Sequence, residues 1–334
     1  MPFPYIDGKR GAEPPKEPVA LPTAQRAAQA APAGYLADER LVDAINVALL
    51  LSQPLLLTGE PGTGKTQLAH WLAWKLGYGK PLVFNTKSGS TARDLFYTFD
   101  TMRRFHVAQT NDKLGSTDNV DYLSYNALGL AILNSRMRKD VEAVLPRGFE
   151  HNGPRRAVVL IDEIDKAPRD FPNDLLHEID AMAFRVAEVR NIEVTAGDDK
   201  RPVLVLTSNS ERNLPDAFLR RCVFYNIPFP TTTRLVDIVH ARLPTFKDGA
   251  RALLDDALKF FIEQRDAGMR KPPSTAELLN WLQAMVSHGA NPAAPLKDSA
   301  DAVRRSLSTL AKTQDDAAEL AARLDAHITA RQPG

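Results

Sequence analysis

The stretch from Leu55 to Thr66 constrains the fold of this chain most, because an apolar run leads there into a glycine-rich segment of fixed pattern. Residues 59–66 fit the pattern G-x-x-x-x-G-K-[ST] at every fixed position. Glycine backbones can turn their N–H groups toward a phosphate without a Cβ in the way. The stretch therefore predicts a strand, a phosphate-binding loop and a helix in direct succession.

The predicted loop carries the groups that a nucleotide site needs. It comprises Gly59, Glu60, Pro61, Gly62, Thr63, Gly64, Lys65 and Thr66. We expect Lys65 to reach the β- and γ-phosphates and the Thr66 hydroxyl to ligate Mg²⁺. The residues from Gln67 onward are expected to form a helix whose N-terminus faces the anion. A glycine-rich turn before an ordinary helix is the alternative, but the Lys-Thr ending favours a nucleotide phosphate site.

The composition limits the number of domains, the kinds of partner and the cellular compartment that fit this chain. The 334 residues, 44% of them apolar and 25% charged, indicate an ordinary globular protein of about two domains. Lysine and arginine (42) nearly balance aspartate and glutamate (41), so no net field attracts nucleic acid or membranes. Cys222 is the single cysteine, which excludes an internal disulfide framework and suits a reducing compartment. With no signal pattern and no apolar run long enough to span a bilayer, we expect a soluble cytoplasmic protein.

The pattern along the chain divides it into three parts. Residues 1–33 are rich in proline and alanine and are expected to form an extended arm, or alternatively an arm that docks on a neighbouring subunit. Residues 34–230 alternate apolar strands with helical patterns, and residues 231–334 contain helical patterns alone. We therefore expect an α/β domain with a parallel sheet between helices, followed by a small all-helical domain.

The same patterns predict the individual elements. Strands are expected at 55–57, 81–86, 157–161, 202–207 and 223–227, with a two-stranded hairpin near 184–194. Helices are expected at 40–51, 125–135, 173–182, 231–243, 249–267, 275–288, 297–312 and 315–330. Ser274 and Glu277 form a capping-box pattern at the start of the helix at 275–288. Residues 100–155 give the least definite pattern.

Four of the predicted apolar strands end in polar residues that could meet at one edge of the sheet, the edge where ligands bind in open α/β sheets. Asp162 ends the strand at 157–161 and is expected to hold Mg²⁺, whereas Glu163 can polarise a water for attack on the γ-phosphate. Asn209 follows the strand at 202–207, and its amide can orient the attacking water or touch the γ-phosphate. Alone, the acidic pair would be structural as often as functional, because such pairs are common at helix starts, and the asparagine would more often be a turn former. Together with the phosphate-binding loop they predict a hydrolytic site.

Two neighbouring arginines, Arg220 and Arg221, precede the last predicted strand. Neighbouring arginines usually lie on a solvated face. The alternative is an arginine finger, a cation delivered to the γ-phosphate in the site of the next subunit. Phosphoryl transfer gains most from added positive charge at that position.

The order GEPGTGKT, VVLIDEID, VLTSNS and LPDAFLRRC, followed by helices, resembles the AAA+ ATPases, and within them the MoxR-like branch related to dynein-type modules. The resemblance covers about residues 35–290. It implies an ATP- and Mg²⁺-dependent ring, commonly a hexamer, in which a neighbour completes each active site. By position, Lys65 and Thr66 correspond to the Walker A ligands, Asp162 and Glu163 to the Walker B pair, and Asn209 to sensor 1. Arg221, with Arg220 beside it, corresponds to the arginine finger.

The resemblance also suggests roles for the sensor 2 position, for Asn85 and for the predicted hairpin. MoxR-like proteins tend to carry a sensor 2 arginine where this chain has Thr275, so either Arg270 or Lys271 supplies the charge or the helical lid senses nucleotide weakly. Asn85 falls where related proteins restrain the catalytic glutamate. The hairpin near 184–194 is similar to an insert that points toward a partner or substrate in related rings, and a hairpin that merely covers the sheet is the alternative.

Three functions are compatible with these features. The first is an ATP-driven, chaperone-like ring that remodels a protein partner, for which the resemblance suggests a protein with a von Willebrand factor A domain. The second is a nucleotide-gated scaffold in a bacterial signalling or defence system, with little turnover. The third, a nucleic-acid motor, is disfavoured by the neutral charge and by the lack of a basic segment with interspersed aromatic residues. The scattered histidines show no ligand spacing, so no metal beyond Mg²⁺ is expected.

Overall fold

The computed structural model describes residues 31–110, 118–210, 214–247 and 251–329. The chain divides into two compact units, one formed by residues 37–59 and 64–227 and the other containing residues 60–63 and everything described from Pro228 onward. Most of the predicted N-terminal arm, residues 1–30, lies outside the described residues. Each unit has its own hydrophobic core.

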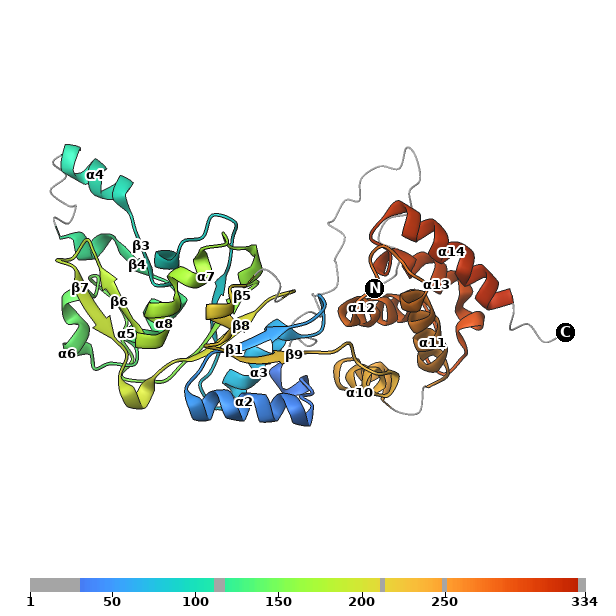
Figure 1. The fold of residues 1–334 in the computed structure, drawn as a ribbon. Coiled ribbons are helices and arrows are strands. Elements are labelled where there is room, and N and C mark those ends of the chain that lie inside the picture. Colours follow the sequence, from blue (N-terminus) through green and yellow to red (C-terminus); the bar gives the residue numbers. More distant parts are fainter. Residues whose placement is uncertain (1–30, 111–117, 211–213, 248–250, 330–334) are drawn as a thin grey trace. The chain divides into compact units, whose positions relative to one another are not determined.

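A five-stranded parallel sheet organises the first unit (Figure 1). Its spatial order is β2 (Leu82–Asn85), β5 (Val158–Asp162), β8 (Val203–Thr207), β1 (Leu55–Thr58) and β9 (Val223–Asn226). The central strands are buried on both faces, and the edge strands β2 and β9 alternate between half-buried and exposed residues. Burial on both faces explains why the central strands appear in the sequence as continuous apolar runs. The predicted parallel α/β fold is confirmed.

Helices pack against this sheet and follow the strands in sequence. Helix α2 (Glu39–Leu51) contacts β9 and β1, α3 (Lys65–Lys75) contacts β5 and β8, and α5 (Ala127–Leu133) contacts β2 and β5. The Asp38 side chain caps α2 by accepting a hydrogen bond from Leu41 N–H at 2.9 Å. The shorter helices are α6 (Arg138–Val141), α7 (Phe171–Asp174), α8 (Leu176–Ala181) and α9 (Asp216–Leu219).

Two antiparallel hairpins extend this unit beyond the parallel sheet. The hairpin of β6 (Ala183–Val186) and β7 (Ile192–Thr195) confirms the one predicted near 184–194. The second, β3 (Tyr97–Phe99) with β4 (Leu123–Tyr125), carries α4 (Thr101–Thr110) between its strands, in the region of least definite pattern (Figure 1). Phe96 stacks on Phe184 with ring centroids 5.2 Å apart, and Tyr97 donates a hydrogen bond to Glu188 at 2.9 Å. The two hairpins therefore pack on each other.

The helix predicted at 173–182 is interrupted in the structure. The continuous helix expected at 173–182 is divided into α7 and α8 at Leu175, so this prediction was wrong in its extent. Leu175 has φ −87° and ψ −11°, away from regular helical values, and it is fully buried. The spacing of the apolar residues correctly predicted which face is buried. It contains no information on the change of backbone conformation at Leu175.

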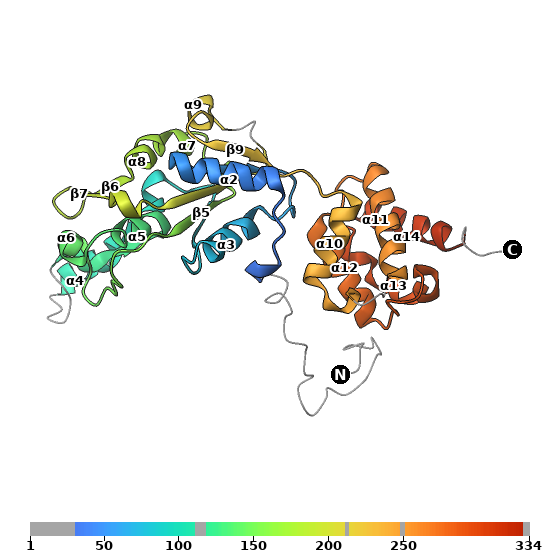
Figure 2. The same ribbon diagram turned by 90° about the horizontal axis from the view of Figure 1, so that it is seen from below.

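The second unit is helical, as predicted. Figure 2 shows its helices α10 (Thr232–Arg242), α11 (Ala252–Asp266), α12 (Thr275–Ser287), α13 (Ala300–Ser306) and α14 (Gln314–Thr329). They pack around a core in which Trp281, Phe260 and Phe261 are fully buried. The capping box at Ser274 and Glu277 is present at the start of α12. The helix expected at 297–312 is shorter, because 3₁₀ turns replace both of its ends.

Short 3₁₀ helices complete the described elements. They are η1 (Pro32–Gly34), η2 (Ala92–Leu95), η3 (Asn119–Tyr122), η4 (Glu142–Val144), η5 (Ile164–Lys166), η6 (Asp198–Lys200), η7 (Pro244–Phe246), η8 (Leu296–Ser299) and η9 (Leu307–Thr309). The turn η5 begins directly after Asp162 and Glu163, so it shapes the chain at the carboxyl end of β5.

Candidate active site

The glycine-rich loop runs from the end of β1 to the start of α3, the position predicted from its pattern. Gly62 has φ +79° and Gly64, which caps α3, has φ +95°. Both values lie in the left-handed region that side chains with a Cβ rarely adopt, so the loop needs glycine at these positions. Thr63 Oγ1 donates a hydrogen bond to the Glu60 carbonyl at 2.9 Å within the loop.

Lys65 begins α3 and is buried to 7% exposure, which is unusual for a lysine. Its ammonium donates hydrogen bonds to the Gly59 carbonyl at 2.7 Å and to Asn209 Oδ1 at 3.1 Å. Burial lowers the pKa of Lys65, and the nearby carboxylates of Asp165, Asp162 and Glu163 act in the opposite direction. The loop lysine is thus held at the carboxyl edge of the sheet, next to Asn209, which lies two residues after the end of β8.

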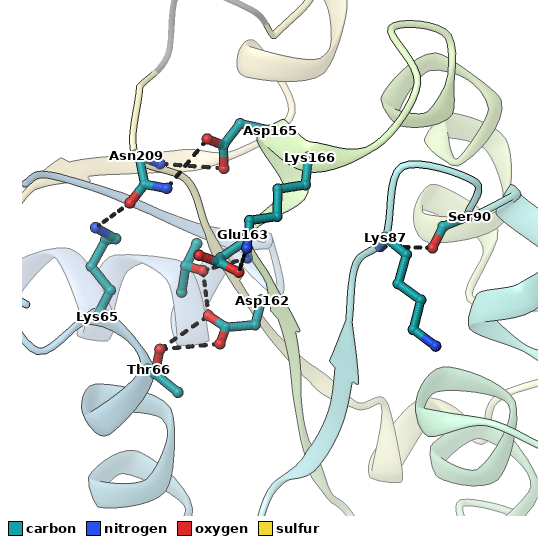
Figure 3. A network of polar contacts seen from close by, with 10 residues as sticks. Lys65, Thr66, Lys87, Ser90, Asp162, Glu163, Asp165, Lys166 and Asn209 are labelled. Carbon is teal, nitrogen blue, oxygen red and sulfur yellow. Dashed lines mark hydrogen bonds and ion pairs between the residues drawn. The ribbon is translucent and has the colours of Figure 1, made fainter. Parts of the chain in front are cut away.

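Thr66, Asp162 and Thr207 form a chain of oxygen atoms across α3, β5 and β8. Figure 3 labels Thr66 and Asp162. Thr66 Oγ1 lies 3.1 and 3.2 Å from the two carboxylate oxygens of Asp162. Thr207 Oγ1 donates to Asp162 Oδ1 at 2.6 Å. Hydroxyl and carboxylate oxygens are the ligands that Mg²⁺ prefers, and Mg²⁺ sites usually combine one or two carboxylates with phosphates and waters. The predicted pair of Thr66 and Asp162 therefore fits a magnesium ion bound together with a nucleotide.

Glu163 follows β5 in a left-handed backbone conformation, with φ +56° and ψ +53°. Its backbone N–H donates to Thr207 Oγ1 at 2.8 Å, which fixes this turn to the neighbouring strand. Its carboxylate pairs with the ammonium of Lys166 on η5. A non-glycine residue at positive φ is uncommon and is often found at functional sites. The turn directs the Glu163 side chain toward Lys166, whereas the Asp162 side chain faces Thr66 (Figure 3).

Asn209 lies at the carboxyl end of β8, next to the loop lysine (Figure 3). Its backbone N–H and its side-chain Nδ2 face the Asp165 carboxylate at 3.3 and 3.4 Å. The structure thus brings together Lys65, Thr66, Asp162, Glu163 and Asn209, which the sequence placed at this edge. Thr207, Asp165 and Lys166 also belong to the cluster, although none of them had a role predicted from the sequence.

The predicted finger arginines lie apart from this cluster. Arg221 follows α9, and its Nε donates to Asp180 Oδ2 at 2.7 Å while Nη1 donates to the Ala217 carbonyl at 3.0 Å. Arg220 is exposed beside it. Neither contact joins the groups around Asp162, so within one chain Arg221 is anchored to α8. Asn85 is exposed and pairs through its backbone with Asp162, and the Glu163 carboxylate contacts Lys166 instead of Asn85.

The positions considered for sensor 2 lie in the helical unit. Thr275 begins α12 and is buried, and its hydroxyl has no hydrogen-bond partner among the described residues. The Arg270 guanidinium lies 3.3 Å from Asp315 at an exposed position. Arg270 is therefore paired within the helical unit.

The parallel sheet, the glycine-rich loop at the start of α3 and the acidic residues that end β5 define a P-loop nucleotide-binding protein. A family model described as the ATPase family associated with various cellular activities (AAA) matches residues 55–230, more than half of the chain. The chain belongs to this family of ATP-binding ATPases. Members of the family typically form oligomers and use ATP with Mg²⁺.

Two further findings concern individual relatives and membranes. No individual curated protein gives a match to this chain. Among the helices of the described segments, none combines the length and the apolar character that crossing a membrane requires.

Proposed function

We propose that this chain is a MoxR-like AAA+ ATPase that hydrolyses ATP as an oligomeric ring and uses the energy to remodel a protein partner. The observation that carries the hydrolytic part is the convergence of Lys65, Asp162, Glu163 and Asn209 at one edge of the sheet. A binding site alone would need the loop and a metal ligand. A carboxylate next to the metal ligand and an amide beside the loop lysine are the additional groups that activate and orient a water.

The proposal gives each loop residue a role in holding the nucleotide. The backbone N–H groups of residues 59, 60 and 62–64 and the N-terminus of α3, up to Gln67, bind the phosphates, whereas Pro61 has no N–H to offer. Lys65 exchanges its contacts with Gly59 and Asn209 for phosphate oxygens. Thr66 and Asp162 would hold Mg²⁺, which when bound neutralises charge on the phosphate oxygens.

Glu163 is the proposed general base. Its carboxylate accepts a proton from the attacking water, whose oxygen bonds to the γ-phosphorus while the bond to the β–γ bridging oxygen breaks and ADP leaves. In the structure this carboxylate is paired with Lys166, so the pair must open before Glu163 can accept the proton. Because the pair is largely exposed, its opening costs little.

Arg221 is proposed to act in the site of a neighbouring subunit, with Arg220 beside it. Its exposed position and its distance from the cluster of its own chain are compatible with this role. Asp180 anchors the arginine at α8, which limits the conformations that the side chain samples before a neighbour docks. The resemblance to the MoxR-like branch favours a hexamer and a partner with a von Willebrand factor A domain.

A nucleotide-gated scaffold with little turnover is the second candidate. Two observations favour it: the Glu163 carboxylate is engaged by Lys166, and the position of the sensor 2 arginine is taken by the buried Thr275. A cytoplasmic location is part of either proposal.

Phosphate release and sedimentation of the purified chain test the proposed function together. We expect release of phosphate from ATP that depends on Mg²⁺, and sedimentation as an assembly of several copies when nucleotide is present. A single-copy protein without turnover would contradict the ring ATPase. An assembly that forms with ATP but releases no phosphate would support the scaffold instead. Purification together with the products of neighbouring genes would then identify the partner.

A further inference from the structure

The Asn209 side chain lies between two groups of opposite hydrogen-bonding character. Lys65 Nζ is 3.1 Å from its Oδ1, and Asp165 Oδ2 is 3.4 Å from its Nδ2 (Figure 3). An ammonium can only donate hydrogen bonds, and an ionised carboxylate can only accept them. The amide can therefore satisfy both neighbours in one orientation alone, with its carbonyl oxygen toward Lys65 and its NH₂ toward Asp165.

Asp165 fixes the main chain of Asn209 as well as its side chain. Asp165 Oδ1 accepts a hydrogen bond from the Asn209 backbone N–H at 3.3 Å, while Oδ2 faces the side-chain amide. Asp165 itself belongs to η5, the single turn that follows Asp162 and Glu163. One carboxylate thus joins the end of β8 to the turn after β5 through two contacts.

This orientation determines what Asn209 offers to a bound nucleotide. An amide whose NH₂ is directed at a phosphate oxygen would donate to it, but here the Asp165 carboxylate accepts one of the two N–H groups and holds the NH₂ on its own side, away from Lys65. The carbonyl oxygen faces the loop lysine, and next to a phosphate oxygen it would be repelled. When Lys65 turns to the phosphates, the carbonyl oxygen of Asn209 becomes free to accept a hydrogen bond from a water.

We infer that Asp165 is a positioning residue that holds the Asn209 amide with its carbonyl oxygen toward the phosphate-binding loop. Asn209 then takes part in hydrolysis as an acceptor that orients the attacking water, and not as a donor to the γ-phosphate. The inference deepens the proposed ATPase function and rests on it for the role of the water.

A double-mutant cycle measures whether Asp165 acts through Asn209. We expect Asp165→Ala to lower kcat for ATP about tenfold and to change the Kd for ATP less than twofold. In the Asn209→Ala background the same substitution should change kcat less than twofold, because the amide to be oriented is gone. Asp165→Asn keeps an acceptor for the Asn209 amide and should restore most of kcat. An equal loss of kcat in both backgrounds would overturn the inference.

Asp170→Ala is the matched control, since Asp170 is an exposed aspartate five residues further along the chain. It should leave kcat unchanged. Circular dichroism and Tm, measured for every variant, separate loss of fold from loss of positioning. If Asp165→Ala does not fold, the cycle is carried out with Asp165→Asn and Asp165→Ser.

Nuclear magnetic resonance of the nucleotide-free protein gives a readout that does not depend on hydrolysis. With ¹⁵N-asparagine labelling, the side-chain NH₂ signals of Asn209 are assigned by their loss in Asn209→Ala. We expect Asp165→Ala to shift these signals and Asp170→Ala to leave them in place. Unshifted signals in Asp165→Ala would contradict the positioning contact even if the wild type hydrolyses ATP. Shifted signals in a wild type without turnover would retain the contact and reject the proposed function, and with it the role of the water.

Discussion

Thr207 donates a hydrogen bond from its Oγ1 to Asp162 Oδ1 at 2.6 Å, which links the ends of two neighbouring strands. The same oxygen accepts a hydrogen bond from the Glu163 backbone N–H at 2.8 Å. One fully buried hydroxyl therefore orients the proposed metal ligand and the turn that carries the proposed base. It determines how the carboxyl end of β5 is presented to the phosphate-binding loop.

Replacing this hydroxyl tests its importance. Thr207→Val keeps the shape of the side chain but leaves the Glu163 N–H and the Asp162 oxygen without this partner. We expect the free energy of unfolding to fall by about 1–3 kcal/mol and kcat for ATP to fall at least about tenfold. Urea denaturation and phosphate release measure the two effects.

Thr86→Val is the matched control for this substitution. Thr86 is a buried threonine directly after β2, and its hydroxyl has no hydrogen-bond partner in the described part of the chain. Its replacement should leave the free energy of unfolding equal or raise it, because an unpaired buried hydroxyl is costly. Equal losses of stability in Thr86→Val and Thr207→Val would show that the contacts of Thr207 contribute little.

The Lys65 ammonium is expected to dominate the affinity for nucleotide. Lys65→Ala removes a buried cation from the phosphate-binding loop, and a charge-assisted hydrogen bond contributes about 1.5–3 kcal/mol. The Kd for ATP should therefore rise about 10- to 100-fold in isothermal titration calorimetry. An unchanged affinity for ATP would refute the assignment of the loop as the phosphate site.

Arg221 is expected to matter for hydrolysis and not for binding. Arg221→Ala should leave the Kd for ATP within about twofold and lower kcat about 10³-fold or more, the range known for arginine fingers. Mixing this variant with Lys65→Ala subunits should restore part of the activity, because some sites then combine an intact loop with an intact arginine. If assembly is intact and mixing restores nothing, the proposed action on a neighbouring subunit is wrong.

The thiol of Cys222 provides a test of packing near Arg221. Burial raises the pKa of Cys222 to about 12, with the Asp180 carboxylate acting in the same direction. The thiol therefore stays neutral in the folded chain, and alkylation by iodoacetamide at pH 8 should be slow until denaturant is added. Because this pKa exceeds the unfolded value of 9.0, the contribution of Cys222 to stability is complete below pH 9 and is lost as the pH rises toward 12. Cys222→Ala should show a smaller loss of stability over that interval.

The sequence predicted the sheet and the main site residues for a physical reason. Central parallel strands bury both faces and appear as apolar runs. Asp162 ends one such run, and Asn209 lies two residues after the end of another. The carboxyl ends of parallel strands lie at one edge of the sheet, and the loop with Lys65 follows another strand of the same sheet. The order of strands and loops along the chain was therefore enough to predict that Asp162 and Asn209 lie near Lys65.

Other parts of the site depend on tertiary contacts that leave no local pattern. Thr207 is a β-branched residue at the end of a buried strand, so its hydrogen bonds to Asp162 and Glu163 could not be told from ordinary strand packing. The left-handed backbone of Glu163 is stabilised by the neighbouring strand and not by its own residue type. In the same way, the packing of Phe96 on Phe184 joins two hairpins far apart in the sequence.

The central claim is that Glu163 makes this site hydrolytic. Its most direct test is phosphate release from ATP with Mg²⁺ by the wild type and by Glu163→Gln, with binding of ATP measured for both. We expect the wild type to turn over, and the variant to bind ATP with similar affinity but to turn over about 10²- to 10⁴-fold more slowly, the usual contribution of a general base. Equal turnover by the two proteins, or no turnover by either, would contradict the claim.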